Sequence, residues 1–184
     1  MSHETFCLDR ITTPLGKMFL VCDDAERLRA AEFAAVEPRM HRLLRLQYGE
    51  GNTALRSGRA PAWLRARIED YFGGSLSALD DIEVATLGTE FQCQVWAELR
   101  SIRPGKTLTY AELATRLGRP TAVRAVGFAN GSNPVCVVVP CHRVIGSNKE
   151  LTGYGGGLDR KRWLLEHEGV LERAPKRSRR KAPG

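Results

Sequence analysis

Alternating apolar and polar residues near the start of the chain predict β-strands. The segments FCLDRITT (6–13) and GKMFLVCD (16–23) alternate and flank a Pro-Leu-Gly turn signal, so residues 6–33 are predicted to form strands. Helical periodicity follows in RMHRLLRLQY (39–48) and APAWLRARIEDYF (60–72), and Gly-Gly ends the second of these. Strands and helices together predict a mixed α/β supporting domain over residues 1–84.

A helix is predicted to open the second half of the chain. TEFQCQVWAELRSI (89–102) has the capping-box pair Thr89 and Gln92, followed by apolar residues spaced four apart. Cys93 and Trp96 in this helix are interpreted as core residues. We expect residues 85–172 to form a second, mainly helical domain.

Two short helices and a tight turn come next, in TYAELATRLGRPTAVRAVGFANGSNP (109–134). Helices over 110–117 and 121–129, with Thr121 as N-cap of the second, form a helix-turn-helix pattern, whose second helix usually reads DNA. That helix has Arg124 as its single charge among small residues. A major-groove reader offers more polar side chains, whereas a small-residue face with one arginine suits a narrow groove. Packing of the alanines in the core is the alternative, and both can hold on opposite faces.

The valine run PVCVVVP (134–140) predicts a buried strand, in which Cys136 serves as a small apolar residue. A turn-rich loop follows this run. The segment DRKRWLLEHEG (159–169) is then predicted to form a helix with Gly169 as its C-terminal cap.

The charge of the chain is concentrated in two places. The net charge is +7, but residues 173–184 hold six Lys/Arg and no acid, which leaves residues 1–172 at +1. Residues 100–150 alone net +6. This distribution fits either a polyanion bound at one face or an ordinary solvated surface. The tail, 173–184, is predicted to be disordered and to add either nonspecific attraction to DNA or solubility.

Composition narrows the class of protein. The chain is 42% hydrophobic and 27% charged, and no apolar run approaches the roughly 20 residues of a membrane helix. Its N-terminus lacks the apolar core of a signal peptide, so we expect a cytoplasmic protein without a membrane partner. The five cysteines form no CxxC pair, which favours reduced thiols and argues against a zinc site.

Cys141 stands between Pro140 and His142 at the end of the valine run, where it is either a structural thiol or a nucleophile. Full ionisation of a free thiol at neutral pH raises its reactive fraction by about 30-fold, or about 2 kcal/mol. Because neighbours on an extended chain point to opposite sides, His142 would reach Cys141 through a water. A carboxylate, Glu168 or Glu166, would fix the tautomer of the imidazole. Such a relay also fits a thiol hydrolase.

The motifs NPVCVVVPCHRVIG, TYAELA, VRAVGFANGSNP, TGYGGGL and RKRWLLEHEG closely resemble the O6-alkylguanine–DNA alkyltransferases, the methylated-DNA–protein-cysteine methyltransferases, of the free-standing bacterial type. The resemblance runs from about residue 91 to 169, and the first half matches mainly through TPLGKMFLV. It implies an α/β (α+β) fold, with a ribonuclease H-like N-terminal domain of sheet and helices and a C-terminal winged helix-turn-helix domain.

The resemblance also implies residue roles. Cys141 would accept the alkyl group irreversibly, and His142 and Glu168 would form the water-mediated relay. Asn133 would tie the helix-turn-helix to the active-site strand, and Tyr110 would crowd a phosphate and bond the guanine N3. On DNA, Arg124 would enter the base stack beside Thr121, Ala122, Ala125 and Gly127, while Val144, Tyr154, Gly155 and Lys161 would line the substrate pocket.

The implied function is direct reversal of DNA damage. An alkyl group passes once from O6-alkylguanine, and also from O4-alkylthymine, in a flipped nucleotide of double-stranded DNA, with no cofactor or metal. The protein is expected to be a monomer that can bind DNA cooperatively. The alternative is a non-catalytic lesion sensor or DNA-binding regulator; Cys141 argues against a sensor, because sensors replace the acceptor. Gly155 departs from relatives with serine there, which leaves the pocket width open.

Overall fold

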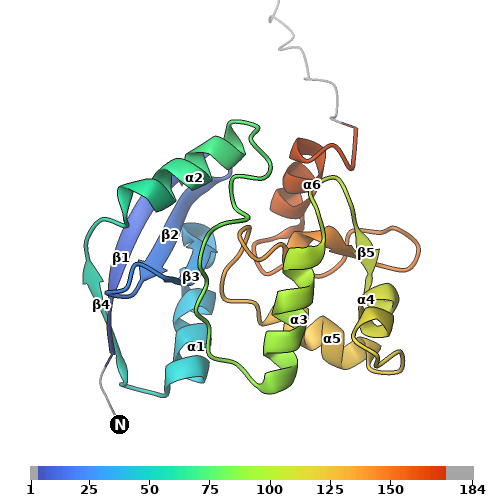
Figure 1. Ribbon diagram of the computed structural model, residues 1–184, viewed down its shortest axis with the longest axis horizontal. Coiled ribbons are helices and arrows are strands. Elements are labelled where there is room, and N and C mark those ends of the chain that lie inside the picture. The colour runs from blue at the N-terminus through green and yellow to red at the C-terminus, as the bar shows by residue number, and fades with distance from the viewer. Residues whose placement is uncertain (1–3, 173–184) are drawn as a thin grey trace, which may run out of the picture.

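A four-stranded sheet forms the first half of the protein, as the computed structural model of residues 4–172 shows (Figure 1). Its strands are β1 (Glu4–Thr13), β2 (Gly16–Cys22), β3 (Leu28–Phe33) and β4 (Thr53–Ser57). They lie in the order β3-β2-β1-β4, antiparallel except for the parallel pair β1 and β4. The strands predicted within residues 6–33 are confirmed, whereas β4 was not predicted because its five residues carry no clear alternation.

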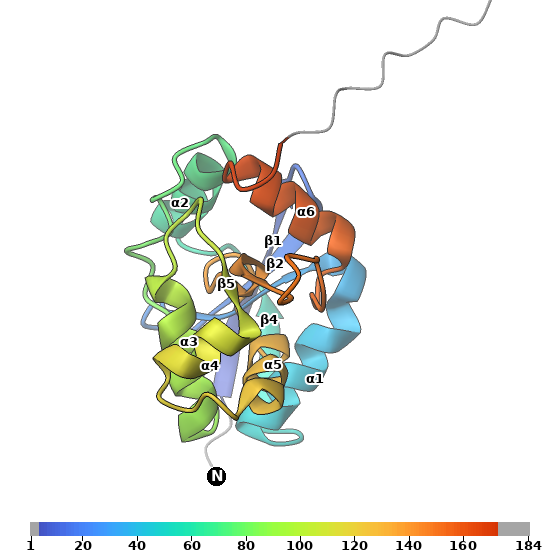
Figure 2. The same ribbon diagram turned by 90° about the vertical axis from the view of Figure 1, so that its right-hand side faces the viewer.

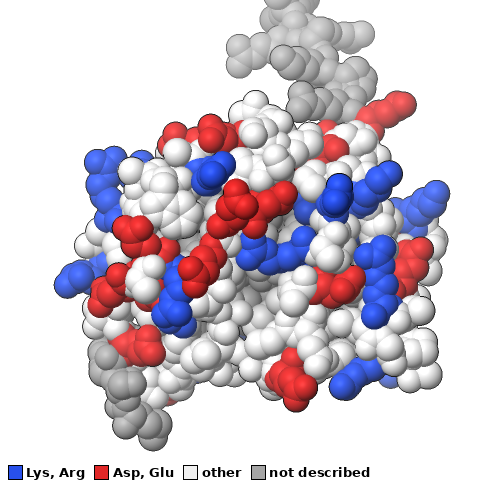
Figure 3. Space-filling model, in the orientation of Figure 1, with Lys and Arg blue, Asp and Glu red and all other residues white. Residues whose placement is uncertain are grey.

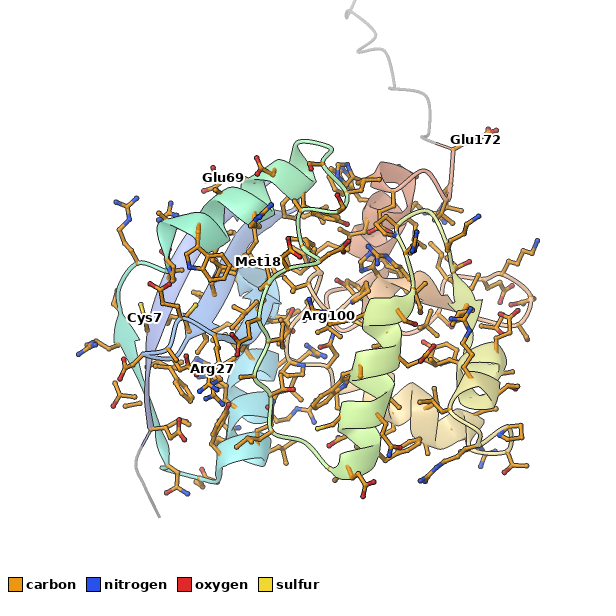
Figure 4. All side chains as sticks on the ribbon, in the orientation of Figure 1. Cys7, Met18, Arg27, Glu69, Arg100 and Glu172 are labelled. Carbon is orange, nitrogen blue, oxygen red and sulfur yellow. The ribbon has the colours of Figure 1, made fainter. Side chains whose placement is uncertain are left out.

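Both faces of the sheet are covered by helices. Helix α1 (Glu37–Tyr48) follows the 3-10 turn η1 (Ala34–Val36), and α2 (Ala62–Phe72) follows β4. Successive residues of β2 point to opposite faces: Phe19 belongs to the apolar cluster that contains α1 residues, and Met18, labelled in Figure 4, to the cluster that contains α2 residues. Both helices confirm the sequence prediction.

The second half is mainly helical, and Figure 2 turns its helix pair α4 and α5 toward the viewer. Its helices are α3 (Glu90–Ser101), α4 (Tyr110–Arg116), α5 (Val123–Gly131) and α6 (Leu158–His167), with a 3-10 turn η2 (Cys141–Arg143). Strands β5 (Leu108–Thr109) and β6 (Val144–Ile145) form a small parallel ladder. The capping box at Thr89 is confirmed, and Gly169 ends α6 at φ +76° in the left-handed region, as predicted.

Two details of the predicted helices are wrong. Helix α5 begins at Val123 after Ala122, whose side chain cannot cap, so Thr121 is not its N-cap. Cys93 is exposed on α3, because the buried stripe of that helix runs through Val95, Trp96 and Leu99. Trp96 is a core residue as predicted, and its indole N–H donates to the carbonyl of Ala129 at 2.9 Å.

The predicted strand over residues 134–140 is also wrong, although its burial is confirmed. The segment folds into a tight turn in which Val137 takes φ +73° and only isolated bridges form, one of them between Cys136 and Val139. The Asn133 side chain closes this turn by bonding the backbone of Val135 and of Val139. The Asn133 side chain makes hydrogen bonds that a neighbouring strand would otherwise make. The pattern of apolar residues along the sequence gives no sign of such bonds.

Edge strand β3 joins the two halves. The Ala31 N–H donates to Pro134 O at 3.0 Å, and the Cys136 N–H donates to Ala31 O at 2.8 Å. Further along the seam, Arg100 of α3 reaches the carbonyl of Asp80 at 2.8 Å (Figure 4). The largest apolar cluster contains residues of both halves. The division at 84/85 stays a prediction, and the tail at 173–184 lies outside the described residues.

Charged side chains are mixed on the face seen in Figure 3, where Lys and Arg alternate with Asp and Glu. The face seen in Figure 3 is therefore not uniformly basic. Within residues 4–172, no helix combines the length and apolar character needed to cross a bilayer.

Candidate active site

Cys141 begins the 3-10 turn η2, directly after the turn that Asn133 closes, and is only 3% exposed. Its N–H donates to Val139 O at 2.8 Å, and its carbonyl accepts the N–H of Val144. Because both backbone groups of Cys141 are bonded within the protein, the fold fixes the backbone that presents its thiol.

The buried Asn133 side chain holds this turn in place. Its Nδ2 donates to Val139 O at 2.8 Å, and its Oδ1 accepts the N–H of Val135 at 2.9 Å. Asn133 follows the last turn of α5, so one side chain connects that helix to the segment that presents Cys141.

Three neighbours lower the pKa of Cys141. The largest effect is a hydrogen bond from the Cys136 thiol, followed by one from Asn133 and by the positive charge of Arg39. Burial and the charge of Glu32 oppose them. The net result is a thiol that ionises more readily than an ordinary cysteine, and a thiolate is the form that attacks.

His142 is fully buried and bonds Glu168, with 2.8 Å between His142 Nε2 and Glu168 Oε1. Burial lowers the pKa of the imidazole, which favours its neutral form. Because an ionised carboxylate only accepts hydrogen bonds, Nε2 carries the proton and Nδ1 presents a lone pair. Among residues 4–172, Nδ1 has no hydrogen-bond partner. The neutral imidazole can therefore accept one proton at Nδ1.

Glu168 is held by three side chains. Arg143 donates to both carboxylate oxygens at 2.9 Å, and the Tyr71 hydroxyl donates to Oε1 at 2.7 Å. Burial alone would raise the pKa of Glu168, but His142 and Arg143 together lower it well below its ordinary value. Of the two carboxylates that the sequence left open, Glu168 is the one at the imidazole.

The predicted pocket residues lie on segments around Cys141. Lys161 is fully buried and donates to Val144 O at 2.5 Å and to Thr152 O at 2.7 Å, and burial lowers its pKa to about 8. The Tyr154 hydroxyl is buried without a hydrogen-bond partner in the described part of the chain. A Cβ at Gly155 would lie 2.4 Å from Arg39 Nε, so a larger residue there would push the Arg39 guanidinium aside. Serine, found in some relatives, would displace Arg39.

Helix α5 presents a distinct outer face. Thr121, Arg124, Ala125 and Phe128 are exposed and recur at helical spacing, whereas Val126 and Ala129 are buried. Ala125 therefore lies on the outside and Ala129 in the core, and the approach of the outer face to a DNA groove stays a prediction. Gly127 lies against the ring of Tyr110, where an added Cβ would sit 3.8 Å from Cδ1.

Comparisons with known proteins decide the family. Residues 90–170 match the model of the 6-O-methylguanine DNA methyltransferase DNA-binding domain. Over 163 residues the chain is 50% identical to the methylated-DNA–protein-cysteine methyltransferase of Salmonella typhimurium, covering 89% of this chain and 95% of the relative. The chain belongs to the methylated-DNA–protein-cysteine methyltransferase family.

Solved structures of this methyltransferase family share the fold. The Mycobacterium tuberculosis protein OGT, crystallised in complex with DNA, superposes with a TM-score of 0.73 at 34% identity, covering 89% of this chain and 93% of OGT. The O6-methylguanine-DNA methyltransferase of Pyrococcus kodakaraensis gives a TM-score of 0.65 at 26% identity, covering 90% and 99% of the two chains. The likeness extends over both halves, including the sheet that the sequence motifs covered only loosely.

Sequence reasoning missed several residues around the methyltransferase site. Arg143 and Tyr71 donate hydrogen bonds to Glu168. The ion pair of Glu32 and Arg39, from the N-terminal half, contacts the turn over residues 134–140, which we call the active-site turn. Arg39 donates to Gly131 O at 2.6 Å and to Asn133 O at 3.1 Å. Arg143 could have been predicted as a site residue, because it follows Cys141 and His142 directly in the sequence. The others come from distant segments without any local motif.

Asn133→Ala is expected to lower the free energy of unfolding by about 1–3 kcal/mol, because it leaves the buried N–H of Val135 without a partner and removes one of the two hydrogen bonds to Val139 O. It should also raise the pKa of Cys141, since one of the hydrogen bonds that lowers it is lost. Urea unfolding and the pH profile of Cys141 alkylation by iodoacetamide measure the two effects. Asn130→Ala, which truncates a buried asparagine within α5, is the control and should leave the pH profile in place.

Proposed function

We propose that the protein repairs DNA as a single-turnover alkyltransferase, moving the alkyl group of O6-alkylguanine onto Cys141. The observation that carries this proposal is the buried series Cys141, His142 and Glu168 in a chain of the methyltransferase family. Transfer from O4-alkylthymine belongs to the same proposal, because the reacting bond has the same O–alkyl chemistry.

Activation of the thiol begins at His142. Nδ1 takes the proton of Cys141 through a bridging water, because the side chains of the neighbours Cys141 and His142 point in different directions. The imidazolium that results is stabilised by the Glu168 carboxylate at 2.8 Å. Arg143 and Tyr71 keep that carboxylate oriented, so the proton moves along a prearranged path.

The transfer itself is a displacement at the alkyl carbon. The Cys141 sulfur forms a bond to this carbon while the bond from carbon to O6 breaks, and the electron pair of that bond passes to the guanine. Tyr110, whose pKa is raised by burial and which therefore stays protonated, donates a hydrogen bond to N3 of the departing base. The product is a thioether, which cannot ionise again, so each molecule acts once.

The damaged base has to leave the duplex to reach a thiol that is 3% exposed. We propose that α5 enters the minor groove with its small-residue face and that Arg124 fills the space left by the flipped nucleotide. Phe128, which is 74% exposed on the same face, packs against the sugars beside it. A repair protein has to accept any flanking sequence, which fits a helix with few base-reading side chains.

We further propose that the halves correspond to a ribonuclease H-like domain and a winged helix-turn-helix domain, with β5 and β6 as the wing. Their support is the mixed sheet with helices on both faces and the pair α4 and α5. The monomeric state and the cytoplasmic location stay predictions from the sequence.

Arg124→Ala is expected to slow repair of duplex DNA by an amount corresponding to about 1–3 kcal/mol, because the extruded base is no longer replaced in the stack. The reaction with free O6-benzylguanine should change little, since no base has to be flipped. Single-turnover rates with the two substrates measure this difference. Arg56→Ala, which removes an exposed charge from the distant edge strand β4, controls for electrostatics. Equal losses with both substrates would contradict the role of Arg124.

Stoichiometry tests the proposed function against its alternative. With O6-methylguanine duplex in excess, demethylation should stop when one lesion has been repaired per protein molecule. A sensor would bind the lesion and leave the methyl group on DNA, and a hydrolase would continue to turn over. Either of these outcomes overturns the proposal.

A further inference from the structure

A second thiol lies beside the acceptor. Cys136 is fully buried and Cys141 is 3% exposed, and both are held at Val139, which pairs with Cys136 in a bridge and accepts the Cys141 N–H at 2.8 Å. The tight turn over residues 134–140 produces this proximity, because the bridge between Cys136 and Val139 folds the segment back on itself and the Cys141 N–H then bonds Val139 O. An extended strand, as the sequence predicted, would have separated the two sulfurs.

Cys136 also has polar partners, which a small apolar residue would not need. Glu32 Oε2 lies 3.6 Å and Arg39 Nη1 lies 3.8 Å from its Sγ, and its single S–H can donate either to Glu32 or to the Cys141 sulfur. Glu32, which is buried, forms an ion pair with the partly buried Arg39. The two sulfurs, the carboxylate and the guanidinium therefore form one buried cluster between β3, α1 and the active-site turn.

The two thiols differ in their readiness to ionise. The hydrogen bond between them, with Cys136 as donor, lowers the pKa of Cys141 and raises that of Cys136. A thiolate beside a protonated thiol is the arrangement in which the first sulfur is oxidised and the second then condenses with it. Glu32 is in place to take the proton that Cys136 has to lose.

We propose that Cys136 is a resolving thiol, which captures Cys141 after oxidation by hydrogen peroxide and holds it as a reversible Cys136–Cys141 disulfide. This step rests on the proposed function, because an opening that brings an alkylated base to Cys141 would also admit a molecule as small as peroxide. The disulfide protects an acceptor that the protein can use only once, because sulfinic and sulfonic acids are not reduced back by thiols.

Two steps complete the oxidation. The Cys141 thiolate attacks one peroxide oxygen, an S–O bond forms, the O–O bond breaks, and hydroxide leaves and is protonated to water. The Cys136 sulfur then attacks the Cys141 sulfur, an S–S bond forms, the S–O bond breaks, and hydroxide leaves, while the Cys136 proton passes to Glu32 and on to that hydroxide. Peroxide gains two electrons, the two thiols lose two, and two waters are released.

Peroxide treatment of the full-length reduced protein tests the proposal without DNA, so its outcome is independent of the alkyl-transfer assay. After unfolding in N-ethylmaleimide, trypsin releases residues 125–143, which contain both cysteines. We expect this peptide to be lighter by two hydrogens and unlabelled after peroxide. Dithiothreitol added before the label should restore two maleimide groups, and it should restore methyl acceptance in a parallel sample.

Cys136→Ser and Cys136→Ala provide the comparison. Without the resolving thiol, the same peroxide dose should carry Cys141 to the sulfinic or sulfonic acid, with two or three added oxygens that dithiothreitol does not remove. Two substitutions are used so that a folding defect in one, detected by its thermal midpoint, does not decide the result. Cys93→Ser, at the exposed cysteine of α3, should behave as the unmodified protein. Over-oxidation of the unmodified protein at the rate seen in both Cys136 variants, or a disulfide joining Cys141 to another cysteine, would overturn the proposal.

Discussion

Cys141→Ala is expected to abolish methyl transfer, because the neighbouring thiol, Cys136, is fully buried and its pKa is raised, so that it does not replace Cys141 as the nucleophile. Binding to O6-methylguanine duplex should be nearly unchanged, since Cys141 is buried and the outer face of α5 is a separate surface. Transfer of radiolabelled methyl groups to protein measures the first effect, and fluorescence anisotropy with labelled duplex measures the second.

Cys93→Ser is the matched control for the loss of a thiol and should retain full transfer. Methyl groups found on another cysteine of the Cys141→Ala protein would show that Cys141 is wrongly assigned as the acceptor. A loss of DNA affinity as large as the loss of transfer would mean that the substitution acts on binding.

Glu168→Gln should have the second largest effect, on stability and on transfer together. The amide keeps the shape of the side chain but removes the charge that Arg143 and His142 face, and breaking a buried ion pair costs about 3–5 kcal/mol. Transfer should slow by about a hundredfold or more, because the His142 tautomer is no longer fixed and the imidazolium loses its partner. Urea unfolding measures the loss of stability, and single-turnover kinetics under conditions in which the variant is folded measure the loss of transfer.

The pH dependence of stability gives an independent test of Glu168. Its folded-state pKa lies well below the ordinary value of 4.5, so below pH 4.5 the unfolded chain takes up a proton that the folded protein resists. The stability that Glu168 confers is therefore complete above pH 4.5 and is lost as the pH falls further. This part of the acid destabilisation should vanish in Glu168→Gln and persist in Glu166→Gln, the neighbouring carboxylate of the same helix end. An unchanged slope in Glu168→Gln would refute the assignment.

Local patterns were sufficient to predict most helices and the strands within residues 6–33, because capping residues and periodicity act within a few positions. They failed at residues 134–140, where valines indicate a strand but the Asn133 side chain folds the segment into a turn. The same local reading placed Cys136 among apolar residues, although its sulfur bonds Glu32.

Contacts over long sequence separations account for the rest of what was missed. Arg39 lies 97 positions from Cys136, and Tyr71 lies 97 positions from Glu168. No periodicity or motif in a single sequence connects such residues. His142 and Glu168, by contrast, were predicted as partners because the family motifs carry both, and the geometry brings them to 2.8 Å.

The central claim is that Cys141 itself accepts the alkyl group. Incubation with O6-methylguanine duplex, followed by trypsin and mass spectrometry, tests it most directly. Because Cys136 and Cys141 share the peptide 125–143, fragment spectra have to distinguish the two sulfurs. The account predicts a gain of one methyl group on Cys141 in each reacted molecule, with unmodified guanine left in the DNA. Loss of the lesion without modification of the protein, or a methyl group on Cys136, would contradict it.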